Sequence, residues 1–191
     1  MDHRTTAKAR WETAVRLTVA PSQDLLYQAL VTFLTAILPA GVPVIRGLPN
    51  RTAMPQPVPG FVTMQALGFN RLRWNIDTWD TTNSAPTTQT SEQGTEVRVQ
   101  LDFYGATSAD WAVTVGTLLR DPYGVAALTP NVAPLYADDA RMIPLTDAEQ
   151  EYEERWSLDA HFQLNAVVTI PQTFANQPAT IDIINVNETY T

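Results

Sequence analysis

One stretch near the end of the chain limits the possible folds most. In residues 151–165 the even positions from Trp156 to Leu164 are apolar, while the odd positions from Arg155 to Asn165 are polar. Because side chains on a β-strand point alternately to opposite faces, this pattern predicts a long strand with one buried and one solvated face. Half-buried strands are typical of antiparallel sheets. We expect the strand to continue to Pro171, which interrupts the ladder.

Two further strands show the same alternation and should form a long hairpin. They cover residues 61–76 and 97–104, and a change of parity near Gly68 predicts a β-bulge. The segment 78–94 between them is rich in Thr, Ser, Asn and Gln, so we expect a flexible hairpin tip. Shorter strands are predicted at 42–46, where Pro43 favours a sheet edge, and at 181–186.

Two helices are expected from apolar spacing and capping residues. Ser22 is the expected N-cap of a helix that ends before Pro39, and Ser108 is the expected N-cap of a second helix ending at Asp121-Pro122. Residues 125–146 contain three prolines and are expected to form turns. Together these elements predict an α+β domain, with a mostly antiparallel sheet of four to five strands, a long hairpin and two packed helices.

The chain length suits one domain over residues 1–191, in which residues 1–20 could form an N-terminal arm that orders against a neighbour. Cysteine is absent, which excludes disulfide frameworks, zinc fingers and thiol nucleophiles. No apolar run approaches the length of a membrane span, and the N-terminus lacks an apolar signal core. We therefore expect no membrane partner and a soluble protein that is intracellular when synthesised.

The net charge of -8 makes tight DNA binding improbable, because nucleic-acid affinity comes mainly from Lys and Arg at phosphates. Such a chain could still form a wall past which DNA slides. The tryptophans Trp74, Trp111 and Trp156 fall on apolar faces and are expected in the core. Trp79 and Tyr136 fall in expected loops, where exposed aromatic side chains more often mark protein contacts.

Few residues suggest catalysis. The two histidines are His3, in the expected arm, and His161, which the alternation places on a solvated or interfacial face. We find no zinc-protease helix motif, phosphate-binding glycine loop or nucleophile elbow. We predict no enzyme activity, cofactor or metal.

Seven carboxylates gather between residues 138 and 154. Three interpretations stay open for them: a solvated surface, an acidic face with a role in assembly, or a calcium site if a loop folds them inward. The acidic residues are Asp138, Asp139, Asp147, Glu149, Glu151, Glu153 and Glu154.

Three groups of segments, in order along residues 22–170, resemble the neck or tail-terminator proteins of long-tailed bacteriophages and prophages. The first joins residues 44–55 (VIRGLPNRTAMP) to 61–64 (FVTM). The second joins 99–105 (VQLDFYG) to 109–111 (ADW). The third runs from 134–141 (PLYADDAR) into 149–156 (EQEYEERW). Each motif alone is weak, and their order and spacing carry the resemblance.

The resemblance implies a non-enzymatic virion subunit that closes into a ring, typically a hexamer. Such a ring caps the tail tube, ends its polymerisation and joins the tail to the head connector. The implied partners are copies of the chain, the tail tube protein, head-tail connector or adaptor proteins, and possibly a sheath. Genomic DNA would pass through without specific binding. The implied location is the virion neck, after assembly in the host cytoplasm.

Two sets of residues are hypothetical contact sites. The predicted subunit contacts are Arg46, Asn50, Arg51, Trp79, Tyr136, Asp138, Asp139 and Arg141. Contacts within one chain are an equally good interpretation of most of them. The predicted acidic lumen face is Glu151, Glu153 and Glu154. The alternatives are another neck or tail component (a head-completion, tube or baseplate subunit) and, from a different class, a carboxylate-dependent hydrolase or calcium-binding module.

Overall fold

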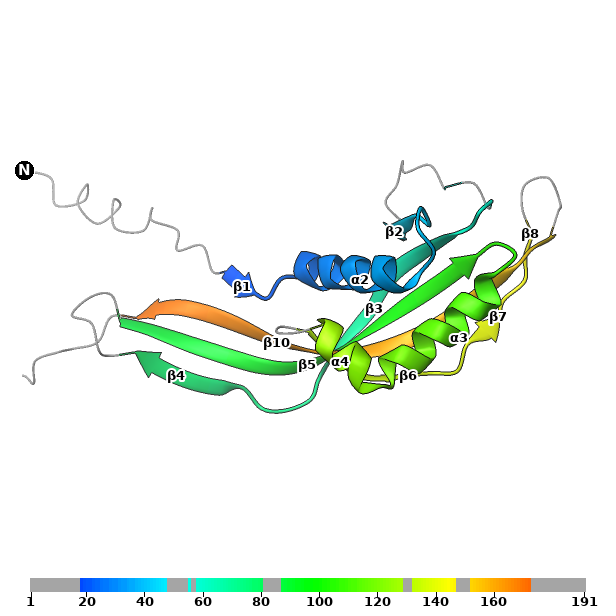
Figure 1. Cartoon of the computed structure of the whole chain (residues 1–191). Helices are drawn as coiled ribbons and strands as arrows, with labels where there is room; N and C mark the ends of the chain where they lie inside the picture. The colour runs from blue at the N-terminus through cyan, green and yellow to red at the C-terminus, as the bar shows by residue number, and fades with distance from the viewer. Residues whose placement is uncertain are drawn as a thin grey trace, which may run out of the picture.

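The computed structural model describes residues 18–47, 55, 58–80, 87–128, 132–146 and 152–172. In this part of the chain, an eight-stranded sheet carries three helices (Figure 1). A separate pair of short strands, β8 (Leu145–Thr146) and β9 (Tyr152–Glu153), lies beside it. The predicted α+β class is confirmed. The sheet has more strands than we predicted, and one pairing, between β2 (Val44–Arg46) and β3 (Phe61–Arg71), is parallel.

Two long antiparallel strands form the centre of the sheet. They are β5 (Thr87–Tyr104) and β10 (Arg155–Gln172), each 18 residues long and paired without a break. At a rise of about 3.3 Å per residue, each strand is roughly 60 Å long. The strand predicted from residues 151–165 is therefore present, but it does not end at Pro171, which pairs with Thr88. Proline is tolerated there because the other side of β10 has no described partner strand at this position.

Shorter strands line both sides of this central pair. The strands β3 and β4 (Ile76–Asp80) pair one after the other with β5. Three strands share the outer side of β10: β6 (Val132–Ala137), β7 (Arg141–Met142) and β1 (Thr18–Ala20). The strand β2 lies at the sheet edge beside β3, as Pro43 suggested.

The predicted bulge is confirmed, since the register between β3 and β5 shifts between Ala66 and Gly68. After β3 the alternation breaks at residues 72–75, which connect β3 to β4. Trp74 lies in this connection and is 82% exposed, so its predicted place in the core is wrong. The sequence pattern was misleading because Leu72, Trp74 and Ile76 keep strand spacing across a loop.

Most of the predicted hairpin tip is strand. Residues 76–80 form β4 and residues 87–94 belong to β5, so the prediction of a loop over 78–94 is wrong for residues 78–80 and 87–94. Threonine has a branched Cβ that suits a strand, and β10 supplies a complete ladder for this polar stretch. Residues 81–86, like the strand predicted at 181–186, lie outside the described residues.

Three helices cover one face of the sheet: α2 (Gln23–Ile37), α3 (Ser108–Leu119) and α4 (Pro122–Leu128) (Figure 1). Ser22 caps α2, and its Oγ accepts a hydrogen bond from the Leu25 amide at 3.4 Å. Ser108 does not cap α3; it is the buried first residue of the helix, after Thr107. The predicted turns at 125–146 are wrong for α4 and β6. Pro122, which we interpreted as a helix stop, begins α4, where a missing N–H costs little.

The core lies between the helices and the apolar faces of β5 and β10. Its largest fully buried side chains include Phe33, Phe103 and Phe162. Trp111 is buried and Trp156 packs against the core, as predicted.

The helices cover only part of the sheet (Figure 1). We call the covered part, built from β2, β3, β6, β7 and the halves of β5 and β10 at 95–104 and 155–164, the body. The remaining strands project from it as a four-stranded extension, formed by β1, β4 and residues 87–94 and 165–172.

Candidate functional site

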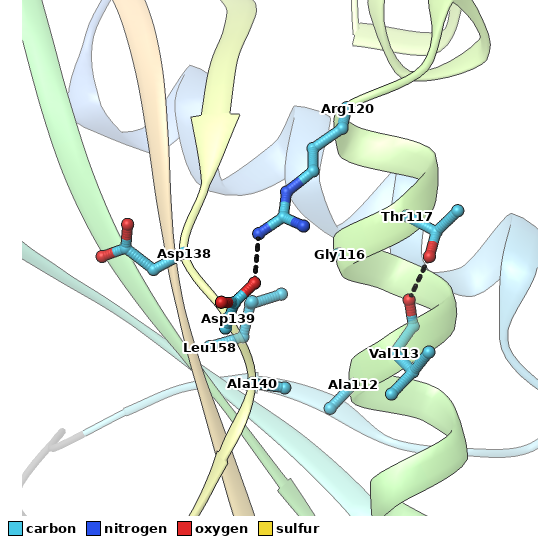
Figure 2. Close-up of a pocket in the computed structure, with 9 residues that line it drawn as sticks. All are labelled: Ala112, Val113, Gly116, Thr117, Arg120, Asp138, Asp139, Ala140 and Leu158. Carbon is cyan, nitrogen blue, oxygen red and sulfur yellow. Dashed lines mark hydrogen bonds and ion pairs between the residues drawn. The ribbon is translucent and has the colours of Figure 1, made fainter.

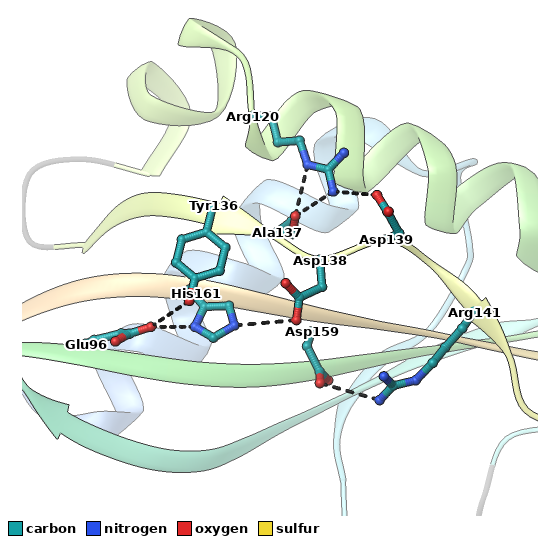
Figure 3. Close-up of polar contacts among 9 residues, drawn as sticks. All are labelled: Glu96, Arg120, Tyr136, Ala137, Asp138, Asp139, Arg141, Asp159 and His161. Atoms are coloured by element: carbon teal, nitrogen blue, oxygen red, sulfur yellow. Dashed lines mark hydrogen bonds and ion pairs between the residues drawn. The ribbon is translucent and has the colours of Figure 1, made fainter.

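Four predicted contact residues lie together beside β10. Tyr136 is on β6, Asp138 and Asp139 follow that strand, and Arg141 begins β7 (Figure 3). They gather because β6 and β7 both pair with β10, at residues 160–164 and 156–157. The sequence predicted these residues as a set, but not what they contact.

Tyr136 and Asp138 enclose a histidine. The Tyr136 ring stacks on the His161 ring with centroids 4.0 Å apart, and its hydroxyl donates to Glu96 Oε1 at 3.2 Å. His161 Nδ1 lies 2.5 Å from the same Glu96 oxygen, and its Nε2 lies 3.8 Å from Asp138 Oδ2 (Figure 3). Partial burial, then the Glu96 carboxylate, raises the pKa of the Tyr136 phenol, which therefore stays a neutral donor.

His161 is only 7% exposed, so the predicted solvated or interfacial position is wrong. The alternation placed it correctly on the polar face of β10. However, Tyr136 on β6, which is 25 residues before His161 in the sequence, packs over that face and covers the imidazole. Each imidazole nitrogen faces a carboxylate, so neither is open to act as a base on a substrate. The cluster binds β5, β10 and β6 together.

Asp139 and Arg141 make contacts within the chain. Arg120, just after α3, donates to Asp139 Oδ1 at 3.0 Å and twice to the Ala137 carbonyl, at 2.9 and 2.6 Å. Arg141 lies 3.5 Å from Asp159 Oδ2. These contacts fit the alternative interpretation from the sequence, in which the residues fix their own loop. Their role between subunits stays a prediction.

A hollow of about 240 Å³ lies between α3 and the connection from β6 to β7 (Figure 2). Its walls include small residues such as Ala112, Gly116 and Ala140, with the Arg120–Asp139 pair at one end. The guanidinium is already committed to Asp139 and the Ala137 carbonyl. The hollow therefore offers no nucleophile–base pair of the kind that hydrolysis needs.

The remaining predicted contacts are spread over the molecule. Arg46, at the end of β2, pairs with Asp24 at 3.3 Å and lies over the Tyr27 ring at 4.3 Å, which holds β2 against α2. Trp79 lies on β4 in the extension and is 54% exposed. Asn50 and Arg51 lie outside the described residues.

The predicted acidic face is only partly described. Glu154 is exposed and accepts a hydrogen bond from Trp156 Nε1 at 2.9 Å. Glu153 belongs to β9, and Glu151 lies outside the described residues, as do Asp147 and Glu149. Among the described residues, no three His, Asp or Glu side chains are placed to hold a metal ion.

The extension, the adjoining end of β3 and the connection between β3 and β4 carry large apolar side chains that a folded core would normally cover. They are at least 44% exposed: Val19, Phe69, Leu72, Trp74, Ile76 and Trp79. Exposed apolar side chains that gather into a patch mark protein–protein contact sites. Of these residues the sequence predicted only Trp79 as an exposed contact, because its pattern assigned 78–94 to a loop and Trp74 to the core.

The family comparison decides what kind of protein carries this surface. Residues 24–191 match a family model described as phage neck terminator protein. The chain belongs to the phage neck terminator family. No curated protein matches the sequence.

Membership confirms the resemblance seen in the sequence. The family is one of structural proteins of the bacteriophage neck, which places the chain in the virion tail, in contact with other tail or head proteins. The match begins at the second residue of α2 and includes every later element, so the body and all of the extension except β1 lie within the region matched to the family. None of the helices in the described part of the chain has the length and apolar content needed to cross a membrane.

Proposed function

We propose that this chain forms a closed ring, most simply a hexamer, between the phage tail and the head. The ring caps the tail tube, stops its polymerisation and joins it to the head connector. The observation that carries this proposal is the family match over residues 24–191. The partners are other copies of the chain, the tail tube protein, connector or adaptor proteins and, in a contractile tail, the sheath. Assembly takes place in the host cytoplasm.

The shape of the subunit supports a ring. A surface on one side of a subunit that fits a different surface on the other side produces a closed ring when the rotation closes. The extension presents exposed apolar side chains and strands at two edges. Sheet edges of this kind join neighbouring chains through backbone hydrogen bonds. We retain Trp79 as the foremost contact, with Arg46, Asn50, Arg51, Tyr136, Asp138, Asp139 and Arg141 as further candidates.

The charges support passage of DNA without binding. The chain carries a net charge of -8, and five arginines in the described part are already paired with carboxylates. Among the described residues, few cations are therefore left to neutralise phosphates, which is the main source of affinity for DNA. We place Glu151, Glu153 and Glu154 on the lumen, where they repel the DNA backbone.

Electron microscopy of virions and of assemblies that lack the chain tests the proposal. We expect an annulus of the protein between capsid and tail tube, and tubes of irregular length without heads when the chain is missing. Native mass spectrometry of the purified protein gives the number of subunits. Density elsewhere in the particle would instead favour a head-completion, tube or baseplate subunit. Turnover of a substrate would contradict the structural role.

A further inference from the structure

The extension ends on both sides at a strand with a single described partner. Its strand order is β4-β5-β10-β1, and within the described residues β4 pairs only with β5 and β1 only with β10. All three pairings are antiparallel, so the four strands alternate in direction. The two outer strands therefore run in opposite directions. A second copy in the same orientation brings its β1 antiparallel to β4 and continues the alternation.

We infer that β4 of one subunit pairs with β1 of the next, so that the partner at this edge is a second copy of the chain. This inference rests on the proposed ring and names the strands that close it. Each copy then uses its two different edges, as a ring with a head-to-tail contact requires.

Side chains at the two edges match across such a contact. Paired residues of a ladder point to the same face, so Trp79 shares the face of Gln89, and Val19 shares that of Val168. On β5 and β10, the same face of the sheet carries Val97 and Leu164, which are buried in the core. Trp79 and Val19 are therefore on the same side of a continued sheet, and both are 54% exposed in the single subunit.

A groove beside Val19 provides room for the indole. It lies where the extension meets the start of α2 and has a volume of about 410 Å³. The apolar part of its lining is Val19, Pro21, Phe69, Leu164 and Ala166. A Trp79 side chain arriving at the β1 edge meets this wall and removes apolar surface of both copies from water.

Charge also favours this partner. Both charged residues of β4, Asp77 and Asp80, are acidic. The sequence that leads into β1 is basic, with Arg4, Lys8, Arg10 and Arg16 against Asp2 and Glu12. The sequence before β1 and the strand β4 are therefore opposite in charge, in a chain whose overall charge is negative.

The absence of cysteine makes the contact directly testable. We would prepare Val19→Cys with Trp79→Cys, and Val19→Cys with Asp77→Cys, because positions 77 and 79 share a face and cover two possible registers. Val19→Cys with Val113→Cys is the control, since Val113 is 60% exposed on α3, away from the extension. Melting temperatures verify that each variant folds. Native mass spectrometry of the wild type establishes the ring before oxidation.

We expect mild oxidation to give disulfide-linked species beyond the dimer in at least one of the first two variants. The control and the four single-cysteine variants, at positions 19, 77, 79 and 113, should not pass the dimer. Rings that form without such species in either variant would overturn the β4–β1 contact and leave the proposed function intact. A wild-type chain that stays monomeric at the highest concentration tested would overturn both.

Discussion

Gly60 directly precedes β3, where the chain passes close under α3. Its φ is +117°, and a β-carbon added there would lie 2.5 Å from the Tyr104 carbonyl oxygen and 2.8 Å from the Trp111 ring. We predict that Gly60→Ala lowers the free energy of unfolding by more than about 2 kcal/mol, from backbone strain together with overlap. Urea denaturation followed by tryptophan fluorescence measures the change.

Gly68 is the matched control. It lies within β3, at the bulge, and an added β-carbon would meet no atom within 4 Å. Gly68→Ala should change the stability by less than about 1 kcal/mol. Equal denaturation midpoints for the two variants would show that Gly60 is not constrained as the structure indicates.

A second prediction concerns the ion pair between Arg155 and Asp102 on the polar face of the sheet. Their side chains are 21% and 11% exposed, and Arg155 Nη2 lies 2.8 Å from Asp102 Oδ2. Burial lowers the pKa of Arg155, but the hydrogen bond and charge of Asp102 outweigh it and the pKa is raised. Asp102→Ala leaves a partly buried guanidinium uncompensated and should cost about 3 kcal/mol in thermal or urea unfolding.

The Arg73–Glu92 pair provides the comparison. It also joins an arginine to β5, but its side chains are 41% and 37% exposed. Glu92→Ala should therefore cost no more than about 0.5 kcal/mol, since exposed pairs are screened by water. A double variant, Asp102→Leu with Arg155→Met, should be more stable than Asp102→Ala alone, because no buried charge is left. The opposite order would contradict the assigned burial.

At the residue scale, the sequence predicted what depends on nearest neighbours. Ser22 caps α2 because a serine before an apolar helical run has its partner three residues away. His161 differs, because its burial depends on Tyr136 in another strand and Glu96 in a third. The pattern of neighbouring residues does not reveal which residues of β5 and β6 lie beside His161. The predicted group Tyr136, Asp138, Asp139 and Arg141 was found from a resemblance, whereas its partners Glu96, Arg120 and Asp159 come only from the fold.

At the scale of elements, the alternation in β10 predicted the scaffold and underestimated its length. Apolar residues mark the buried half of each central strand, where helices provide a core. In the extension, β5 is polar on both faces from residues 87 to 93, so the period-two signal disappears although the ladder continues. Strand β6 was missed for a related reason, because Pro134 in its middle indicated a turn. It tolerates the proline with a register shift beside β10.

The uncovered extension leads to a third prediction, for hydrogen exchange. In the free subunit, we expect amides of β1 and β4 to exchange faster than those of β5 between residues 97 and 103. These outer strands have one described partner each and exposed apolar side chains, whereas residues 97–103 lie under helices. In the assembled ring, protection should rise in β1 and β4 and stay unchanged in 97–103. Equal protection of all four strands before and after assembly would contradict an edge contact.

At the scale of the whole molecule, the sequence predicted the family and the α+β class, since both depend on the order of motifs over most of the chain. The sequence predicted less about the contacts between copies of the chain. The angle between neighbouring subunits depends on the twist of the extension and on which edge strands remain free, and both arise only after the sheet has formed. Trp74 shows the difference clearly, because its spacing predicted a place in the core whereas the structure leaves it 82% exposed.

The last prediction concerns the passage of DNA through the proposed ring. An acidic wall keeps phosphates away by charge repulsion, so the effect should follow the charge at Glu151, Glu153 and Glu154. We predict that changing all three to Gln slows DNA ejection moderately and that changing all three to Lys slows it most. Fluorescent dye that reports released DNA gives the rate from purified virions. Ring formation and melting temperature, measured on the same variants, separate this effect from loss of assembly.

Salt distinguishes a Coulombic effect from a steric one. The screening length falls from about 8 Å at 0.15 M salt to about 3 Å at 1 M, so the Lys variant should approach the wild-type rate as ionic strength rises. Gln and Lys side chains of similar length keep the steric change small. If the slower ejection persists at high salt, its cause is altered packing near Trp156, whose indole donates to Glu154. Wild-type rates in all variants at low salt would remove these three residues from the lumen.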